Sequence, residues 1–236
     1  MTIGNKKGFT LSLLLFLCME GVLLSLAHWQ FLRMEEKETL INELNQSISH
    51  NIQPYTKSLK PAKGSKIHLH GRFDGSRAQI WENQLLDGKP GWRILVPFIT
   101  EQGTEIIVDR GFTKRVPPSE VPPLLNSMTD GNHYQITGLV RYPKQQEGII
   151  KGPKKGNMER SILFLDLDLF PMADELKREP FYVVSLTGTH PKLTAKAWIN
   201  GFGPETHRGY MLTWALLAAI LPFFYAVFAR RFFKKG

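Results

Sequence analysis

Cysteine is almost absent from this chain of 236 residues, whose only thiol belongs to Cys18. Cys18 lies within an apolar run near the N-terminus, so the rest of the chain has no thiol and can form no internal disulfide. These absences exclude thiol–disulfide exchange and copper carriage by a Cys-x-x-x-Cys pair.

Catalytic motifs are missing too. The sequence has no Gly-rich phosphate loop, no G-x-S-x-G nucleophile elbow, no HExxH helix and no Cys/His zinc cluster. Asp166 and Asp168 stand two residues apart in an apolar run, where a strand would place them on one face as an acid/base pair. Outward polar positions of a strand explain them with fewer assumptions, and His190 has no identifiable partner. An enzyme is therefore the weaker hypothesis, and a binding or assembly module is the stronger one.

The net charge of +9 is unevenly distributed. Lys6, Lys7 and four cations of the C-terminal tail supply six positive charges and Glu20 removes one, so residues 33–208 carry only +4. No Lys/Arg cluster is interleaved with aromatic residues, which argues against nucleic acid as a partner. The terminal cations instead fit the flanks of membrane spans, because the cytoplasmic ends of such spans are rich in Lys and Arg.

One long apolar run covers residues 209–229. At a rise of 1.5 Å per residue, about twenty apolar residues cross the roughly 30 Å hydrocarbon core of a bilayer. Tyr210 and Trp214 occupy the positions of an interfacial aromatic belt, and Arg230 and Arg231 open a basic tail. The pattern predicts a transmembrane helix whose C-terminal end is cytoplasmic.

A second apolar run covers residues 9–32. A cleaved signal peptide is the alternative, because Ser25-Leu26-Ala27 fits a cleavage site, but the run is too long for an ordinary signal and continues into Trp29. We favour an uncleaved anchor. The expected organisation is a cytoplasmic N-terminus (1–8), two spans (9–32 and 209–229), an exported periplasmic domain (33–208) and a cytoplasmic tail (230–236).

The central region changes from helical to strand periodicity. Residues 33–49 carry one apolar stripe at helical spacing, so we expect a helix that ends before Pro54 and continues the first span as one rod. Alternating apolar residues then predict strands at 66–73, 79–86, 92–100, 104–112, 134–141, 161–169 and 181–186. A Pro-rich surface excursion (116–123), a polar loop (144–156) and a short helix (172–178) are expected between them. The fold class expected is an α+β membrane protein with a small antiparallel β-barrel or sandwich.

Two histidines of the first of these strands, His68 and His70, share its outward face. A two-histidine metal site is conceivable there, but no third ligand is in view. Solvated histidines are the simpler interpretation, and we expect no metal ion.

Several segments together resemble the Surfeit locus protein 1 family. In chain order they are Trp29-Gln30-x-x-Arg33; Gly71-x-Phe73, Gly91-Trp92 and Val108-Asp109-Arg110-Gly111-Phe112; Gly138-x-x-x-Tyr142-Pro143; and His207-x-x-Tyr210-x-x-x-Trp214. The family usually has Asn in place of Asp109 and Trp in place of Phe112. The resemblance implies an inner-membrane assembly factor for haem-copper cytochrome c oxidase, without catalysis of its own. Its partners would be oxidase subunit I and proteins that synthesise or insert haem a.

A candidate haem a site follows where the two spans leave the membrane. His207, Tyr210 and Trp214 have the spacing of one helical stripe, and His28, Trp29 and Arg33 leave the first span at the same level. Imidazole is a common axial ligand of haem iron, and Arg33 or Arg208 could pair with propionates. We expect His207 to be the transient ligand, with His28 less favoured; an aromatic belt without ligand is the alternative.

Glu20 lies near the middle of the first span, where a carboxyl group is costly. We expect it to be protonated and to donate to the Ala218 carbonyl, which Pro222 deprives of its helical donor. Gly21 and Ser25 would then face Ala215 and Ala219 across a contact of small residues. The alternative is that Glu20 contacts a partner subunit.

Overall fold

The computed structural model describes residues 3–57, 60–143, 155–158, 160–170, 176–198 and 201–234. The chain divides into two compact units. One is a helix pair formed by Met1–Leu40 and Phe202–Gly236, and the other is a sheet domain formed by Ile41–Gly201.

The helix pair consists of most of α1 (Ile3–Ser49) and all of α3 (Pro204–Lys234). Both helices are long and apolar enough to cross a membrane, judged by length and composition. The helical rod expected from the first span through residue 49 is confirmed, because α1 is one uninterrupted helix that ends before Pro54. Pro222 lies inside α3, and the helix continues through it.

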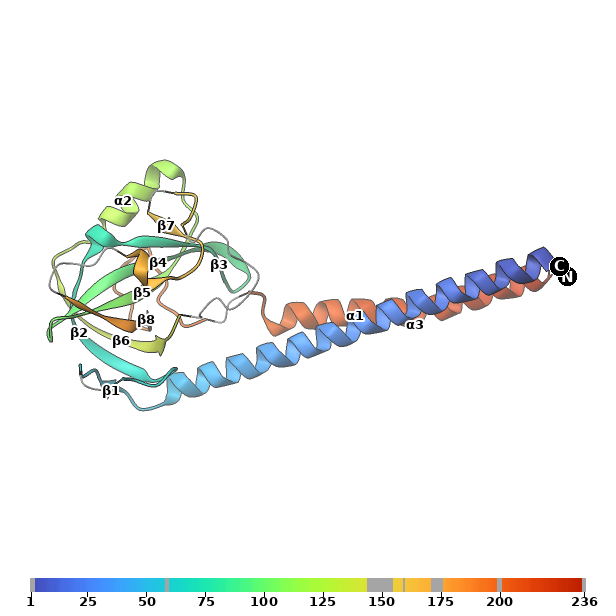
Figure 1. Cartoon of the computed structure of the whole chain (residues 1–236), viewed down its shortest axis with the longest axis horizontal. Coiled ribbons are helices and arrows are strands. Elements are labelled where there is room, and N and C mark those ends of the chain that lie inside the picture. The colour runs from blue at the N-terminus through green and yellow to red at the C-terminus, as the bar shows by residue number, and fades with distance from the viewer. Residues whose placement is uncertain are drawn as a thin grey trace. The chain divides into compact units, whose positions relative to one another are not determined.

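The two helices lie side by side and antiparallel, with the start of α1 beside the end of α3 (Figure 1). Aromatic rings dominate their contact at this end. Phe9 packs on Phe232 and Phe233 with ring centroids 5.6 and 4.8 Å away, and Phe16 stacks on Tyr225 at 4.3 Å. Offset aromatic pairs contribute about 0.5–1.5 kcal/mol each beyond the area they bury.

The expected contact of small residues is wrong. Gly21 and Ser25 are exposed, and a Cβ added to Gly21 would meet nothing within 4 Å. Ala218 is instead the buried small residue of α3, with 4% of its surface exposed. Large aromatic side chains hold the helices together, so the close backbone approach that Gly and Ser permit is not used here.

The expected bond from Glu20 to Ala218 is also wrong. No hydrogen bond joins these two residues in the described part of the chain, and the Oε2 atom of Glu20 is buried without a hydrogen-bond partner there. The prediction relied on depth in the membrane and on the Ala218 carbonyl that Pro222 leaves without its helical donor. Depth brings two residues to one level but does not turn their polar atoms toward each other.

The described residues of the sheet domain form eight strands: β1 (Gln53–Pro54), β2 (Lys66–Phe73), β3 (Gln79–Leu86), β4 (Lys89–Thr100), β5 (Thr104–Lys114), β6 (His133–Arg141), β7 (Ser161–Ile162) and β8 (Lys177–Ser185). Their order is β1-β2-β6-β8-β5-β4-β3-β7, and β2 also pairs with β4. Pairing therefore runs from β2 through β6, β8, β5 and β4 back to β2. Strand β3 and the turn at Asp87-Gly88 that joins it to β4 lie where the sequence predicts them.

The prediction of an antiparallel sheet is wrong for three strand pairs. The pairs β5–β8, β1–β2 and β3–β7 are parallel. A parallel pair needs a long crossover, and the segment between β5 and β8 supplies one that contains β6. Hairpin turns reveal antiparallel neighbours in a sequence, but crossovers of this length leave no comparable local signal.

Strand alternation creates two apolar clusters on opposite faces of the strands. Ile67, Leu69, Phe98, Ile106 and Phe181 belong to the first cluster. Leu95, Ile107, Val184 and Trp198 belong to the second, on which Leu44 from the last turns of α1 also packs. Gly71 lets β2 and β4 approach closely, since a Cβ there would lie 2.0 Å from the Ile99 carbonyl oxygen.

Four shorter expectations need correction or lie outside the described residues. The expected strand 161–169 is only β7, followed by a 3-10 turn at Leu167–Leu169. The excursion 116–123 contains the 3-10 turn η2 (Pro118–Glu120) and the start of helix α2 (Val121–Asn126), which buries Leu124 and Leu125. Residues 144–154 and 171–175 lie outside the described part, and Lys177 and Arg178 begin β8 rather than ending a helix.

Candidate functional site

The site begins with one polar contact across the helix pair. His207 lies in the first turn of α3, and its Nδ1 atom is 2.8 Å from Oε1 of Gln30 on α1. Gln30 is only 8% exposed, whereas His207 is half-buried. Burying an amide is unfavourable unless it is hydrogen-bonded. This contact therefore favours the observed position of the first turn of α3 along α1.

The register of the pair follows from two contacts. Gln30 meets His207, and Ser12 lies 3.3 Å from the hydroxyl of Tyr225. The two α1 residues are eighteen positions apart, and so are the two α3 residues, so the helices run antiparallel without a shift. This register brings His28 and Trp29 level with the turn of α3 that contains Tyr210. The predicted common level of these residues is thus a property of the helix pair.

Aromatic residues of the predicted stripe divide between two faces. Trp214 is half-buried, as is His207, and both are on the side of α3 that includes Ala218. Tyr210, by contrast, is 54% exposed. The expected single stripe of His207, Tyr210 and Trp214 therefore splits, because residues three apart on a helix differ in direction by about 60°.

The α1 residues of the predicted site are exposed. Trp29 is 49% exposed, and His28 is also exposed. The Arg33 guanidinium lies 5.8 Å from the centroid of the Trp29 ring and pairs with Glu36 at 2.6 Å. Such an exposed ion pair contributes little stability, so Arg33 remains able to exchange Glu36 for another anion.

Arg208, the alternative partner for a propionate, pairs with two carboxylates, whereas Arg33 pairs with one. Its two amino nitrogens contact Glu38 on α1 and Glu205 on α3, each at 3.3 Å. Gln30 and Glu38 of α1 make polar contacts with the first turns of α3, and neither was among the predicted site residues. The only sequence signal for Gln30 is its place in the Trp29-Gln30-x-x-Arg33 segment.

The carboxylates of the enzyme hypothesis do not form a strand pair. Asp166 begins the 3-10 turn at Leu167–Leu169, and its Oδ1 accepts a hydrogen bond from the backbone nitrogen of Asp168 at 3.1 Å. Asp168 itself is exposed. Both interpretations of these residues assumed a strand, and that assumption is wrong because Asp166 caps a turn.

Three histidines of the sheet domain, His68, His70 and His190, contact other groups of the protein. His68 Nδ1 lies 3.1 Å from Oγ1 of Thr137, and the rings of His68 and His70 are 4.7 Å apart. No group of three His, Cys, Asp or Glu side chains arranged for a metal occurs among the described residues. His190, predicted to have no partner, contacts the Ser127 hydroxyl at 3.2 Å and accepts from the Lys192 backbone nitrogen at 3.3 Å. Burial, and then the positive charges of Arg110 and Lys192, lower the pKa of His190.

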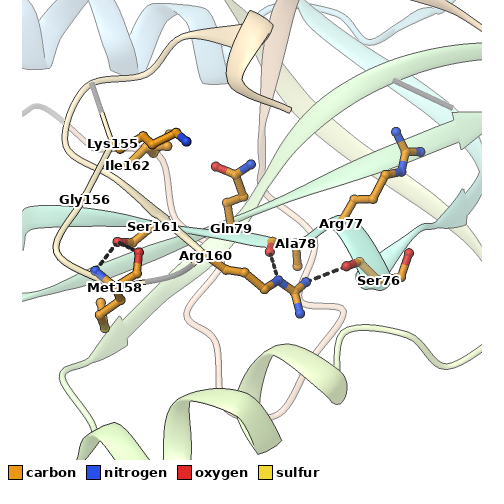
Figure 2. A pocket seen from close by; sticks show the side chains of 10 residues that line it. All are labelled: Ser76, Arg77, Ala78, Gln79, Lys155, Gly156, Met158, Arg160, Ser161 and Ile162. Carbon is orange, nitrogen blue, oxygen red and sulfur yellow. Dashed lines mark hydrogen bonds between the residues drawn. The ribbon is translucent and has the colours of Figure 1, made fainter. Parts of the chain in front are cut away.

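A cavity of about 490 Å³ lies beside β3 and β7. Its lining includes Arg77, Arg160 and Lys155 (Figure 2). Arg160 donates to the carbonyl oxygens of Gly75, Ser76 and Ala78 at 2.8–3.0 Å, as Figure 2 shows for the last two. Arg77 pairs with Asp74 and Glu105, each at 2.6 Å. Both guanidinium groups thus bind other groups of the protein and stabilise the segments around the cavity.

A sheet-rich domain between two helices that could cross a membrane is typical of a membrane protein with two anchors. Comparison with known proteins supports this class and narrows it. A model of the SURF1 family matches residues 17–219, and the chain therefore belongs to the SURF1 family. Members of this family are known generally as cytochrome oxidase assembly factors.

Two relatives match nearly the whole chain. A SURF1-like protein of Dictyostelium discoideum is 23% identical over 274 residues, covering 96% of this chain and 98% of that protein. A SURF1-like protein of Rickettsia felis is 24% identical over 217 residues, covering 89% of this chain and 92% of that protein. Both alignments include the sheet domain together with most of the helix pair.

Proposed function

We propose that this protein is a non-catalytic assembly factor for haem-copper cytochrome c oxidase and that it assists insertion of haem a into subunit I. The observation that supports this most strongly is the family match, which extends from within α1 to within α3. Oxidase subunit I and the proteins that make or deliver haem a are the partners this function requires.

The proposal includes a location in the inner membrane. Lys6 and Lys7 precede the apolar part of α1, and Arg230, Arg231 and Lys234 end α3. Because cytoplasmic flanks are rich in cations, both termini are assigned to the cytoplasm and the sheet domain to the periplasm. The first apolar run then serves as an uncleaved anchor.

His207 is the proposed ligand of haem a. Its Nδ1 atom is bonded to Gln30, whereas its Nε2 atom has no hydrogen-bond partner in the described part of the chain. The residues therefore fit a haem: one ring nitrogen of His207 stays open at a level of the helix pair that also carries exposed aromatic rings. When bound, haem a would supply its iron as the redox centre, while the chain holds and releases it.

The other predicted residues would assist binding in different ways. The exposed rings of Trp29 and Tyr210 offer apolar area to a macrocycle, and half-buried Trp214 lies on the same side of α3 as His207. Arg33 could pair with a propionate in place of Glu36. His28, exposed one residue before Trp29, is the less favoured second ligand.

The experiment compares haem a retention by the wild type and by His207→Ala, purified from membranes that make haem a. We expect an optical haem band in the wild type and its loss in the variant, with His28→Ala as the matched control that keeps most of the band. Equal retention in wild type and His207→Ala would exclude His207 as the ligand. Normal oxidase activity in the His207→Ala strain would remove His207 from the mechanism.

A further inference from the structure

Gln30 is an unusual residue for its position. It is the one polar side chain of α1 that is buried within the described residues, at 8% exposure, while its neighbours Trp29 and Phe31 are exposed. Burying an amide against apolar helices is unfavourable unless both its oxygen and nitrogen have partners. Its oxygen has found one partner, the Nδ1 atom of His207 at 2.8 Å.

The chemistry of that contact defines the state of the imidazole ring. An amide oxygen can only accept a hydrogen bond, so Nδ1 of His207 must carry the proton and donate it. In a neutral imidazole only one ring nitrogen is protonated, and Nε2 is then left with its lone pair. A ring nitrogen binds a metal centre through such a lone pair.

We infer that Gln30 is a positioning residue that holds His207 in its Nδ1–H form and so keeps Nε2 available to a metal centre such as haem iron. That the centre is haem iron rests on the proposed function, whereas the effect of Gln30 on the ring does not. Ligating histidines commonly have their other ring nitrogen held by a hydrogen-bond acceptor, and loss of that acceptor typically lowers affinity roughly 10- to 100-fold.

The same geometry distinguishes the two candidate ligands. His28 is exposed and has no hydrogen bond from either ring nitrogen among the described residues, so both of its neutral forms remain accessible. The turn that carries His207 is held a second time, because Arg208 bridges Glu38 and Glu205. The orientation of the His207 ring is therefore set by its hydrogen bond to Gln30, whereas no hydrogen bond among the described residues sets that of His28.

The test reads the protonation of the ring directly. The full-length protein, labelled with ¹⁵N-histidine and kept free of haem in detergent micelles, is examined by NMR at a pH of about 8.5, where an ordinary imidazole is neutral. The His207 signals are assigned among the seven histidines by their loss in His207→Gln. We expect Nδ1 to be protonated and Nε2 to be unprotonated.

Two variants separate positioning from packing. Gln30→Met keeps the size of the side chain but removes the acceptor, so we expect the proton to redistribute to Nε2 and haem a retention to fall roughly 10- to 100-fold. Gln30→Glu keeps an acceptor oxygen and should restore both the Nδ1–H form and haem retention. A purely structural role for Gln30 would predict no change in the position of the ring proton.

Three outcomes would overturn the inference: a protonated Nε2 in the wild type, an unchanged ring in Gln30→Met, or unchanged haem retention in a Gln30→Met protein whose ring proton has moved. The first would mean that the amide group donates to the ring instead of accepting from it. Loss of the ligand role of His207 would be detected separately, as equal haem retention by wild type and His207→Ala. In that case the NMR result would still decide whether Gln30 fixes the ring.

Discussion

The buried ion pair between Arg93 on β4 and Asp109 on β5 allows a direct test of how buried charges affect the stability of the sheet domain. Both side chains are 0% exposed, and Arg93 Nε donates to the Asp109 carboxylate. Arg93 also donates to the Lys196 carbonyl oxygen at 3.1 Å, and its guanidinium lies 3.7 Å from the centroid of the Trp198 ring. Burial raises the pKa of Asp109, while Arg93 opposes the shift by favouring the charged carboxylate.

Removing only one partner leaves the other charge buried and uncompensated. For Asp109→Leu or Arg93→Met the expected cost is about 3–5 kcal/mol of unfolding free energy. In a domain of this size about 1 kcal/mol shifts Tm by roughly 2–4 °C, so each single variant should lose roughly 6–20 °C. The double variant Arg93→Met, Asp109→Leu removes both charges of this pair, leaves neither one unpaired and should be more stable than either single variant.

The measurement is thermal unfolding of the full-length protein in detergent micelles, followed by circular dichroism of the sheet. Lys196→Met is the matched control, because the Lys196–Asp87 pair at 3.0 Å is half-exposed and contributes about 0–1 kcal/mol. Losses in the double variant that equal the sum of the single losses would refute the reasoning, since they would show that the two charges do not depend on each other.

Three further predictions concern topology, catalysis and pH. In a Cys18→Ser background, a cysteine at exposed Asn132 should react with an impermeant maleimide from the periplasm, and one at Lys234 only after permeabilisation; a mature N-terminus at His28 would instead establish signal cleavage. An Asp166→Asn, Asp168→Asn double variant should support oxidase assembly at the wild-type level, and loss of assembly with unchanged Tm would revive the enzyme hypothesis. Because the pKa of His190 is lowered in the folded state, the unfolded chain binds more protons as pH falls through about 6.5 and stability declines there. His190→Gln should reduce this decline in Tm between pH 7.5 and 5.5, and an unchanged slope would contradict the assignment.

Turns and long helices were predicted correctly from the sequence, because they depend on residues that are neighbours in the chain. Asp87-Gly88 adopts the turn that its composition favours, with positive φ at both residues, so the bounds of β3 and the start of the hairpin follow from the sequence. Apolar length likewise predicts both long helices. The parallel pairing of β5 with β8 could not be predicted in this way, because it joins segments about seventy residues apart.

In the candidate site, too, some residues could be predicted from the sequence and others depend on how distant segments pack. His207, Trp29 and Arg33 became candidates because they belong to the segments that carry the family resemblance. Their spacing along two antiparallel helices then predicted that they lie at one level. Gln30 was missed because its importance depends on which helix face meets α3, and the aromatic contacts near Phe16 and Tyr225 decide that face. Glu20 shows the converse: an expected bond across the pair is absent although depth in the membrane allows it.

The parallel pairing of β8 also determines when the sheet can be completed during synthesis. Strands β5 and β6 both pair with β8, which ends at Ser185, so a chain shorter than this leaves each with an open hydrogen-bonding edge. Non-local pairing of this kind folds slowly, and open edges invite pairing with other chains. Nearly the whole domain must therefore leave the ribosome before its sheet closes, and α3 is the next helix made. Nascent chains arrested before β8 should depend on chaperones more strongly than chains arrested after it.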